Sequence, residues 1–176
     1  APTIEVALLI GICIASPRRI KANNRGVRMA GLLLAALMSI GNAHQAIRLI
    51  VGISDGSDDF DASELLLAGA GIWVTNIVVF ALWYWELDRG GPAARANGER
   101  QHPDFLFPQM HHDHAPRTWE PSFFDYLYVA FTNATAFSPT DTMPLSRWAK
   151  MTMMAQAAIS LMIGALVIAR AIGILQ

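Results

Sequence analysis

The chain has 176 residues, of which 53% are apolar and only 15% are charged, whereas soluble domains carry roughly 25% charged residues. A single cysteine excludes a disulfide scaffold, and the high apolar content excludes a disordered chain. A net charge of −1 without a basic face argues against nucleic-acid binding. The sequence therefore predicts one all-α domain, a multi-pass transmembrane helix bundle whose surroundings are membrane lipid.

Three stretches are long enough to cross the membrane, whose core of about 30 Å takes about 20 apolar residues. They cover residues 29–53, 65–87 and 148–175. A fourth apolar stretch, 4–16, is short. We expect it to be a truncated or processed N-terminal helix rather than a signal-peptide remnant, because its basic flank follows it instead of preceding it. Residues 88–120, rich in Gly and Pro, are expected to form a polar loop.

A fifth apolar stretch lies within residues 121–145. Its apolar part, 122–137, is too short for a comfortable span and too apolar for a surface loop. Such a length is typical of a re-entrant or interfacial segment, although a short fifth span also fits. Both alternatives stay open on the sequence alone.

The charges of the loops predict an orientation. Residues 16–28 contain five basic residues and no acid, whereas residues 54–64 contain five acids and no base. The positive-inside rule therefore places 16–28 in the cytoplasm and 54–64 outside. The helix 65–87 then returns to the cytoplasmic side, where Trp83, Tyr84 and Trp85 are expected to form an aromatic belt at the membrane interface.

Polar residues interrupt the first long span. Four of them follow the spacing i, i+3, i+4, i+7 of one helical face: Gly41, His44, Gln45 and Arg48. Because an ionisable group near mid-membrane costs at least about 2.5 kcal/mol, this face is expected to meet protein or water. It forms either an ion, proton or ligand pathway, or a helix contact with Arg48 snorkelling to the outer surface. Asn76 is a predicted hydrogen-bond partner for Asn42 or His44.

Histidines in the 88–120 segment form a weak candidate metal site: His111, His112 and His114. Imidazole suits Zn or Ni, but the spacing matches no helical zinc motif and no cysteine accompanies it. The alternative is an exposed cluster on a loop. The sequence has no nucleophile–base constellation, P-loop or dinucleotide fingerprint, so it predicts neither an enzyme nor a cofactor.

Residues 125–150 read DYLYVAFTNATAFSPTDTMPLSRWAK. They resemble the pore helix, filter and outer turn of the tetrameric potassium-channel superfamily, where Thr-Ala-Thr-Thr-Val-Gly-Tyr-Gly-Asp is followed two residues on by Pro and then by a second membrane helix. Residues 133–141 align with that run without a gap, and Pro144 falls in register. The resemblance implies a pore or filter formed by seven residues: Thr135, Ala136, Phe137, Ser138, Pro139, Thr140 and Asp141.

This filter-like run departs from the channel pattern. Ser138 and Thr140 replace the two glycines, and Pro139 fixes φ near −65° and removes an N–H, so the usual ladder of backbone carbonyls is not expected. A cation pathway would instead use the hydroxyls of Thr135, Ser138 and Thr140, or a ring of Asp141 carboxylates. One chain supplies one part of a ring, so the resemblance implies a homo-oligomer, a tetramer.

The sequence of residues 65–150 also resembles a family of bacterial inner-membrane proteins without an assigned activity. This resemblance implies an integral protein of the bacterial inner (plasma) membrane. It leaves open a second function, that of a non-transporting structural or accessory subunit of a larger membrane complex. In that interpretation residues 138–144 are an ordinary turn, and the resemblance to potassium channels does not imply ion conduction.

Overall fold

The computed structural model describes residues 25–55, 61–99, 102–111, 119–135 and 141–174. Its elements in chain order are α2 (Arg25–Asp55), α3 (Ala62–Leu87), the 3-10 turn η1 (Asp88–Gly90), α4 (Pro92–Ala96), β1 (Phe105–Leu106), the 3-10 turn η2 (Pro108–Met110), α5 (Phe123–Thr135), β2 (Met143–Pro144) and α6 (Arg147–Ile174). The all-α fold class fits, since both strands are two residues long. The N-terminal helix expected at 4–16 lies outside the described residues.

Helices α2, α3 and α6 are 31, 26 and 28 residues long. At 1.5 Å per residue each measures roughly 40 Å or more, which exceeds the hydrocarbon core of a bilayer. All three are long and apolar enough to cross a membrane. The predicted spans 29–53, 65–87 and 148–175 are therefore confirmed as long apolar helices, with their ends moved by about one turn or less, and they support an integral membrane protein.

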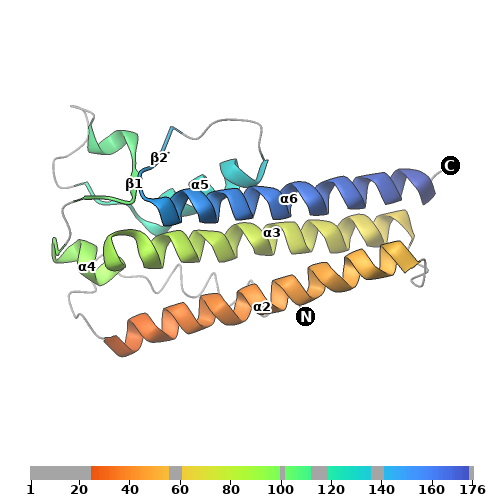
Figure 1. Cartoon of the computed structure of the whole chain (residues 1–176), viewed down its shortest axis with the longest axis horizontal. Coiled ribbons are helices and arrows are strands. Elements are labelled where there is room, and N and C mark those ends of the chain that lie inside the picture. The colour runs from red at the N-terminus through yellow and green to blue at the C-terminus, as the bar shows by residue number, and fades with distance from the viewer. Residues whose placement is uncertain (1–24, 56–60, 100–101, 112–118, 136–140, 175–176) are drawn as a thin grey trace.

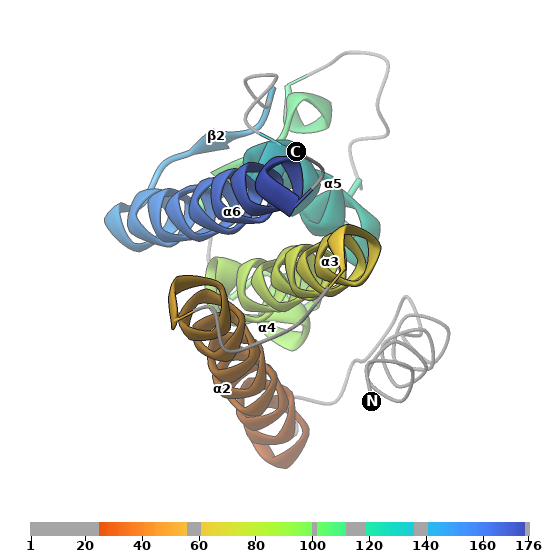
Figure 2. The same ribbon diagram turned by 90° about the vertical axis from the view of Figure 1, so that its right-hand side faces the viewer.

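Helix α3 is the central element. Figure 1 shows α2 and α6 running in one direction and α3 in the other. The view along the helices in Figure 2 places α3 between α2 and α6, with α5 against α3 and α6. We call the end where α3 stops and α2 and α6 begin the cap end, because α4, β1 and β2 lie there; the opposite end is the far end (Figure 1).

Local chemistry sets both ends of α3. At the far end, Asp61 caps the helix by accepting hydrogen bonds from the Ser63 hydroxyl at 2.6 Å and the Glu64 amide at 2.8 Å, and these bonds lower the pKa of Asp61. At the cap end, Arg89, Gly90 and Gly91 have φ angles of 50°, 86° and 100°. Three consecutive left-handed residues reverse the chain out of α3, a conformation that suits glycine.

The 88–120 segment is more ordered than the polar loop expected from its composition. Phe105 is fully buried, and Phe107 is 3% exposed. The ring of Phe105 lies 5.0 Å from that of Tyr84 and 5.7 Å from that of Trp148. Pairing of β1 with β2 holds Phe105 against the start of α6, and Phe107 is buried in the same core. A segment rich in Gly and Pro therefore contributes to the core.

Close approach of α3 and α6 at the far end depends on a glycine. A Cβ atom added at Gly69 would lie 2.6 Å from Cγ2 of Val167, whereas one added at Gly71 or Gly164 would meet nothing within 4 Å. Small residues let membrane helices pack closely, and here Gly69 is the one that a stiff Val side chain approaches.

We therefore predict that Gly69→Ala lowers the stability of the protein by about 1–3 kcal/mol, because the added methyl group overpacks the α3–α6 contact. Gly71→Ala is the matched control and should not destabilise, since its methyl group enters open space on the same helix. Thermal unfolding in detergent, followed by circular dichroism, measures both. Equal midpoints for the two variants would contradict the tight contact.

Candidate functional site

Helix α5 and the chain that follows it return to the end from which they start. The helix has 13 residues, about 20 Å, and so is too short to cross a bilayer. It begins at the cap end, where the ring of Phe123 lies 6.0 Å from that of Trp85 near the end of α3. After it, Met143 and Pro144 of β2 pair with β1, which is also at the cap end. We call residues 123–144 the return segment.

The tip of α5 reaches about halfway along the bundle. The ring of Phe131 lies 6.0 Å from that of Trp73, edge to face. Trp73 precedes the end of α3 at Leu87 by roughly 20 Å of helix. Helix α5 therefore runs from the cap end to about halfway along the bundle, and β2, which follows it in the chain, lies back at the cap end.

A buried amide fixes α5 to the two helices beside it. Gln156 of α6 is fully buried. Its Oε1 accepts hydrogen bonds from the Tyr84 hydroxyl at 2.7 Å and from Nδ2 of Asn133 at 2.8 Å, and its Nε2 donates to the carbonyl of Ala130 at 2.8 Å. Buried networks whose members are all satisfied hold their elements in one arrangement. Asn133 and Gln156 thus join α5 to α6, and Tyr84 joins both to α3.

Tyr84 was expected in an interfacial aromatic belt, and this is wrong, because the side chain is fully buried and bonded to Gln156. Its neighbours Trp83 and Trp85 are only partly buried. Successive residues on a helix point about 100° apart, so three adjacent aromatic residues cannot share one surface. Trp83 instead donates to the Ser39 hydroxyl of α2 at 2.9 Å.

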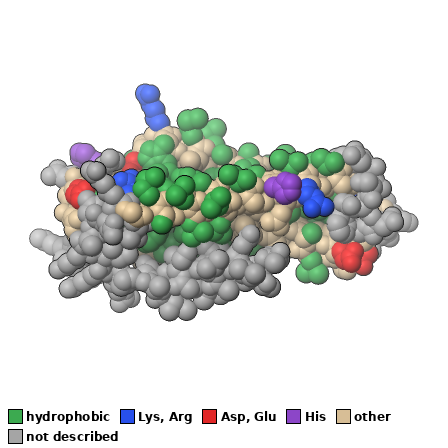
Figure 3. All heavy atoms as spheres, turned by 90° about the horizontal axis from the view of Figure 1, so that it is seen from below, with side chains coloured by type: hydrophobic (Ala, Val, Ile, Leu, Met, Phe, Trp, Pro, Cys, Tyr) green, Lys and Arg blue, Asp and Glu red, His purple; other side chains and the backbone are tan. Residues whose placement is uncertain are grey.

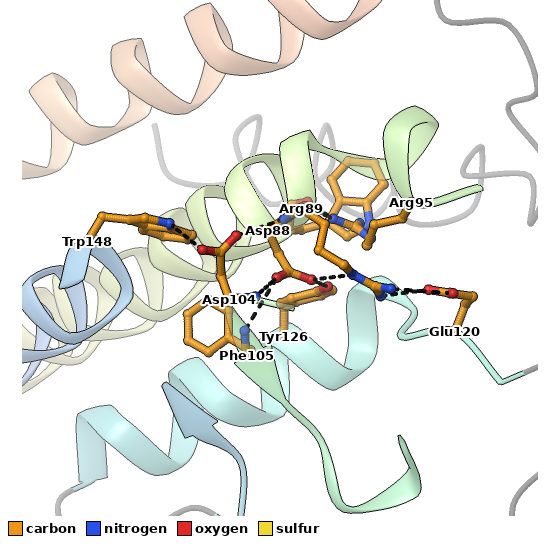
Figure 4. A network of polar contacts seen from close by, with 9 residues as sticks. Asp88, Arg89, Arg95, Asp104, Phe105, Glu120, Tyr126 and Trp148 are labelled. Carbon is orange, nitrogen blue, oxygen red and sulfur yellow. Dashed lines mark hydrogen bonds and ion pairs between the residues drawn. The ribbon is translucent and has the colours of Figure 1, made fainter. Parts of the chain in front are cut away.

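A network of buried polar groups lies at the cap end (Figure 4). Its centre is the carboxylate of Asp88, which is fully buried. Asp88 accepts hydrogen bonds from the Tyr126 hydroxyl at 2.6 Å and from the amides of Asp104 and Phe105 at 2.8 and 3.4 Å. Nε of Arg89 lies 3.5 Å from the same carboxylate. Burial raises the pKa of Tyr126 well above its ordinary value, so its hydroxyl stays protonated and donates to Asp88.

Asp104 joins this network to the end of the return segment. Its carboxylate accepts from the amide of Arg89 and from the Trp148 indole, both at 2.9 Å, and its carbonyl accepts from the amide of Leu145 at 2.8 Å. Trp148 lies in the first turn of α6, and Leu145 follows β2 directly. Asp104 therefore fixes the position at which the return segment leaves the bundle.

Two arginines complete the network. Nη1 of Arg95 donates to the carbonyls of Trp85 and Asp88 at 2.7 and 2.8 Å, and its guanidinium carbon lies 5.1 Å from the centre of the Tyr126 ring. The Arg89 guanidinium pairs with Glu120, with Nη2 2.7 Å from Oε2. Both arginines are buried, so positive charge surrounds Asp88 while hydrogen bonds satisfy the end of α3.

Of the seven filter-like residues, Thr135 and Asp141 are described, whereas residues 136–140 lie outside the described part of the chain. Thr135 ends α5, is half-buried and donates its hydroxyl to the carbonyl of Thr132 at 3.0 Å. Asp141 is exposed, two residues before β2. They therefore mark the deep start and the exposed end of the filter-like run.

The intramembrane polar residues do not gather in one place. Asn76 donates to the Ser160 hydroxyl of α6 at 2.9 Å, rather than to Asn42 or His44 as expected, because its side of α3 faces α6. Asn42 is buried, and its Oδ1 has no hydrogen-bond partner in the described chain. His44, Gln45 and Arg48 are exposed on the outer face of α2.

The candidate metal site stays a prediction. His111 is described and exposed, whereas His112 and His114 lie outside the described residues. Within the described ranges, no three His, Cys, Asp or Glu side chains gather in a way that suits a metal ion.

The network around Asp88 is not predicted by the sequence. Its clearest signal was the string Glu-Leu-Asp-Arg-Gly-Gly-Pro at residues 86–92, which places an acid and a base directly after an apolar span and before a tight turn. The partners of Asp88 lie up to 38 residues away in the chain, beyond the reach of any helical periodicity.

The chain was also compared with known proteins. No family model, curated protein or solved structure matches it.

We predict that Tyr126→Phe destabilises the protein by about 1.5–3 kcal/mol, because it removes a hydrogen bond to a buried carboxylate. Tyr128→Phe is the matched control, since Tyr128 lies on the exposed face of the same helix, 56% exposed. Thermal unfolding in detergent separates the two variants. A loss for Tyr128→Phe as large as that for Tyr126→Phe would contradict the role of the network.

Proposed function

We propose that this chain is one subunit of a homo-oligomeric membrane pore, a tetramer, which passes cations along its return segment. The observation that carries the proposal is that α5 packs against α3 and α6 from the cap end to about halfway along the bundle, while β2 after it pairs with β1 back at the cap end. Helix α5 is too short to cross a bilayer, and a chain that ends its helix at membrane depth has to be buried in protein or line a water-filled cavity. A pathway through the return segment meets that requirement.

The chemistry of the segment favours cations. Asp141 is exposed where the segment leaves the bundle, and Thr135 lies at its deep end. Rings of carboxylates attract cations, and a threonine oxygen whose hydrogen is already donated to the backbone retains lone pairs for an ion. Asp141 supplies the charge at the mouth, and Thr135 supplies a neutral oxygen ligand deeper in.

An oligomer is part of the proposal, because one chain provides one fraction of a ring. The outward face of α5 carries three exposed rings, Phe124, Tyr128 and Phe131, at the spacing i, i+4, i+7. This face is available to a neighbouring subunit, while the inward face is bonded to α3 and α6 within its own chain. The neighbour would then complete the surroundings of the return segment.

The proposed orientation follows from charge. Arg28, Arg89, Arg95, Arg147 and Lys150 all belong to elements at the cap end, whereas Asp61 and Glu64 lie at the far end. By the positive-inside rule the cap end is cytoplasmic, in a bacterial inner membrane. The mouth formed by Asp141 therefore opens to the cytoplasm.

The test is cation flux into liposomes that contain the purified protein. We expect K⁺ or Na⁺ flux above that of protein-free liposomes, and we expect Asp141→Asn to reduce it severalfold by removing charge at the mouth. The matched control is Glu64→Gln, which neutralises an exposed acid at the far end and should leave flux unchanged.

Two outcomes would contradict the proposal. The first is the absence of flux from correctly folded protein, which favours an accessory subunit without transport. The second is equal flux for the wild type and Asp141→Asn. That result would show that a ring of Asp141 carboxylates does not control the flux. The mass of the protein in detergent gives the number of subunits independently.

A further inference from the structure

The outer face of α2 carries a polar patch within an apolar span. The patch consists of His44, Gln45 and Arg48, all of which are exposed. Among the residues that the structure describes, none bonds to the side chains of His44 or Arg48. Figure 3 shows a histidine and a basic side chain next to one another on a face with many hydrophobic side chains. Exposed Ile40 and Ile47 lie on the same side of α2.

The depth of His44 makes lipid an unsuitable neighbour for its side chain. The apolar stretch of α2 runs from Arg28 to Ile53. Arg48 precedes its far end by about 7 Å and His44 by about 13 Å, at 1.5 Å per residue. A long arginine side chain can snorkel to the surface from such a depth, whereas the short imidazole of His44 cannot. Ionisable residues within a span are almost always turned toward protein or water.

The shape of the patch suits a helix. Gly41 lies one turn before His44 and Gln45, and a Cβ atom added there would meet nothing within 4 Å. Glycine on an open helical face lets the backbone of a second membrane helix approach closely. The patch thus offers an open glycine with hydrogen-bond donors one and two turns further on.

Among the described helices, charge argues against a second copy of this chain as the occupant. Within the described spans, α3 has no acid between Glu64 and Glu86, and α6 has none at all. A second copy docking by the same face would oppose basic groups with basic groups, and a copy docking by α3 or α6 would offer no acid at this depth. A carboxylate is the complement of an arginine, which it binds by charge-assisted hydrogen bonds.

We propose that the outer face of α2 binds a transmembrane helix of a different protein, and that this helix carries an Asp or Glu at the depth of His44 and Arg48. The inference is independent of cation conduction, because it concerns the outer face of α2, whereas α5 packs mainly against α3 and α6. Gly41 sets the closeness of the two helices, and Arg48 selects the acid.

The experiment uses a designed partner. A Leu-rich transmembrane peptide carries one Asp about 7 Å from its outer end, and a matched peptide carries Leu there. Energy transfer between the labelled full-length protein and each peptide is measured in phosphatidylcholine vesicles. We expect the Asp peptide to bind about tenfold more tightly than the Leu peptide, in the range of polar contacts between membrane helices. Arg48→Gln should remove most of this preference.

Arg170→Gln is the control variant, because Arg170 is an exposed arginine on α6 and should not affect the preference. Equal binding of the two peptides would overturn the proposal, as would a preference that survives Arg48→Gln. Self-association that depends on Arg48 without a preference for Asp would assign the face to a second copy. A signal that follows the content of anionic lipid would assign it to headgroups, and both results overturn the proposal.

Discussion

The structure depends on a buried carboxylate, that of Asp88, at the end of its central helix. An acid at a helix C-terminus is disfavoured by the helix dipole, and burial disfavours it further. Here the Arg95 guanidinium binds the last carbonyls of α3, while two amides and the Tyr126 hydroxyl satisfy the carboxylate. Tyr126 belongs to α5. Asp104, whose amide binds Asp88, also accepts a hydrogen bond at its carbonyl from the amide of Leu145, directly after β2. One residue therefore fixes both where the return segment enters the bundle and where it leaves.

Helix association changes in character along the bundle, and the physics of membranes explains why. Lipid tails are as apolar as leucine side chains, so burial of apolar surface between helices provides little drive within the membrane, and close packing and polar contacts take its place. The far end has the close packing, in the contact of Gly69 with Val167. The middle has the polar contacts, through Asn76 with Ser160 and Gln156 with Asn133. At the cap end, within the described chain, ion pairs and backbone amides join the elements.

The sequence predicts the elements of this fold well and their contacts poorly. Three spans follow from the length of apolar runs, and the shortness of α5 follows from the same count. The rotation of each helix about its axis cannot be predicted in the same way, because α3 is apolar on nearly every side. Periodicity therefore does not predict that Asn76 faces α6 or that Tyr84 turns inward. The partners of Asp88 were equally hidden, since charge patterns identify a loop but not which of its acids is buried. At the candidate site, length left both re-entry and spanning open, and the pairing of β1 with β2 depends on long-range contacts that length does not encode.

The contacts also separate rigid from adjustable parts. Helix α5 is joined to α3 by the bond from Tyr126 to Asp88 and to α6 by the amides of Asn133 and Gln156, so it is held at both ends of its length. Swinging it outward would leave several buried polar groups without partners, which is expensive in a membrane. Helix α2 meets α3 through apolar contacts and the bond from Trp83 to Ser39, and its opposite face carries the polar patch. Under the proposed function α5 is thus a fixed part of the pathway, and the proposed partner binds α2, which the bonds that hold α5 do not include.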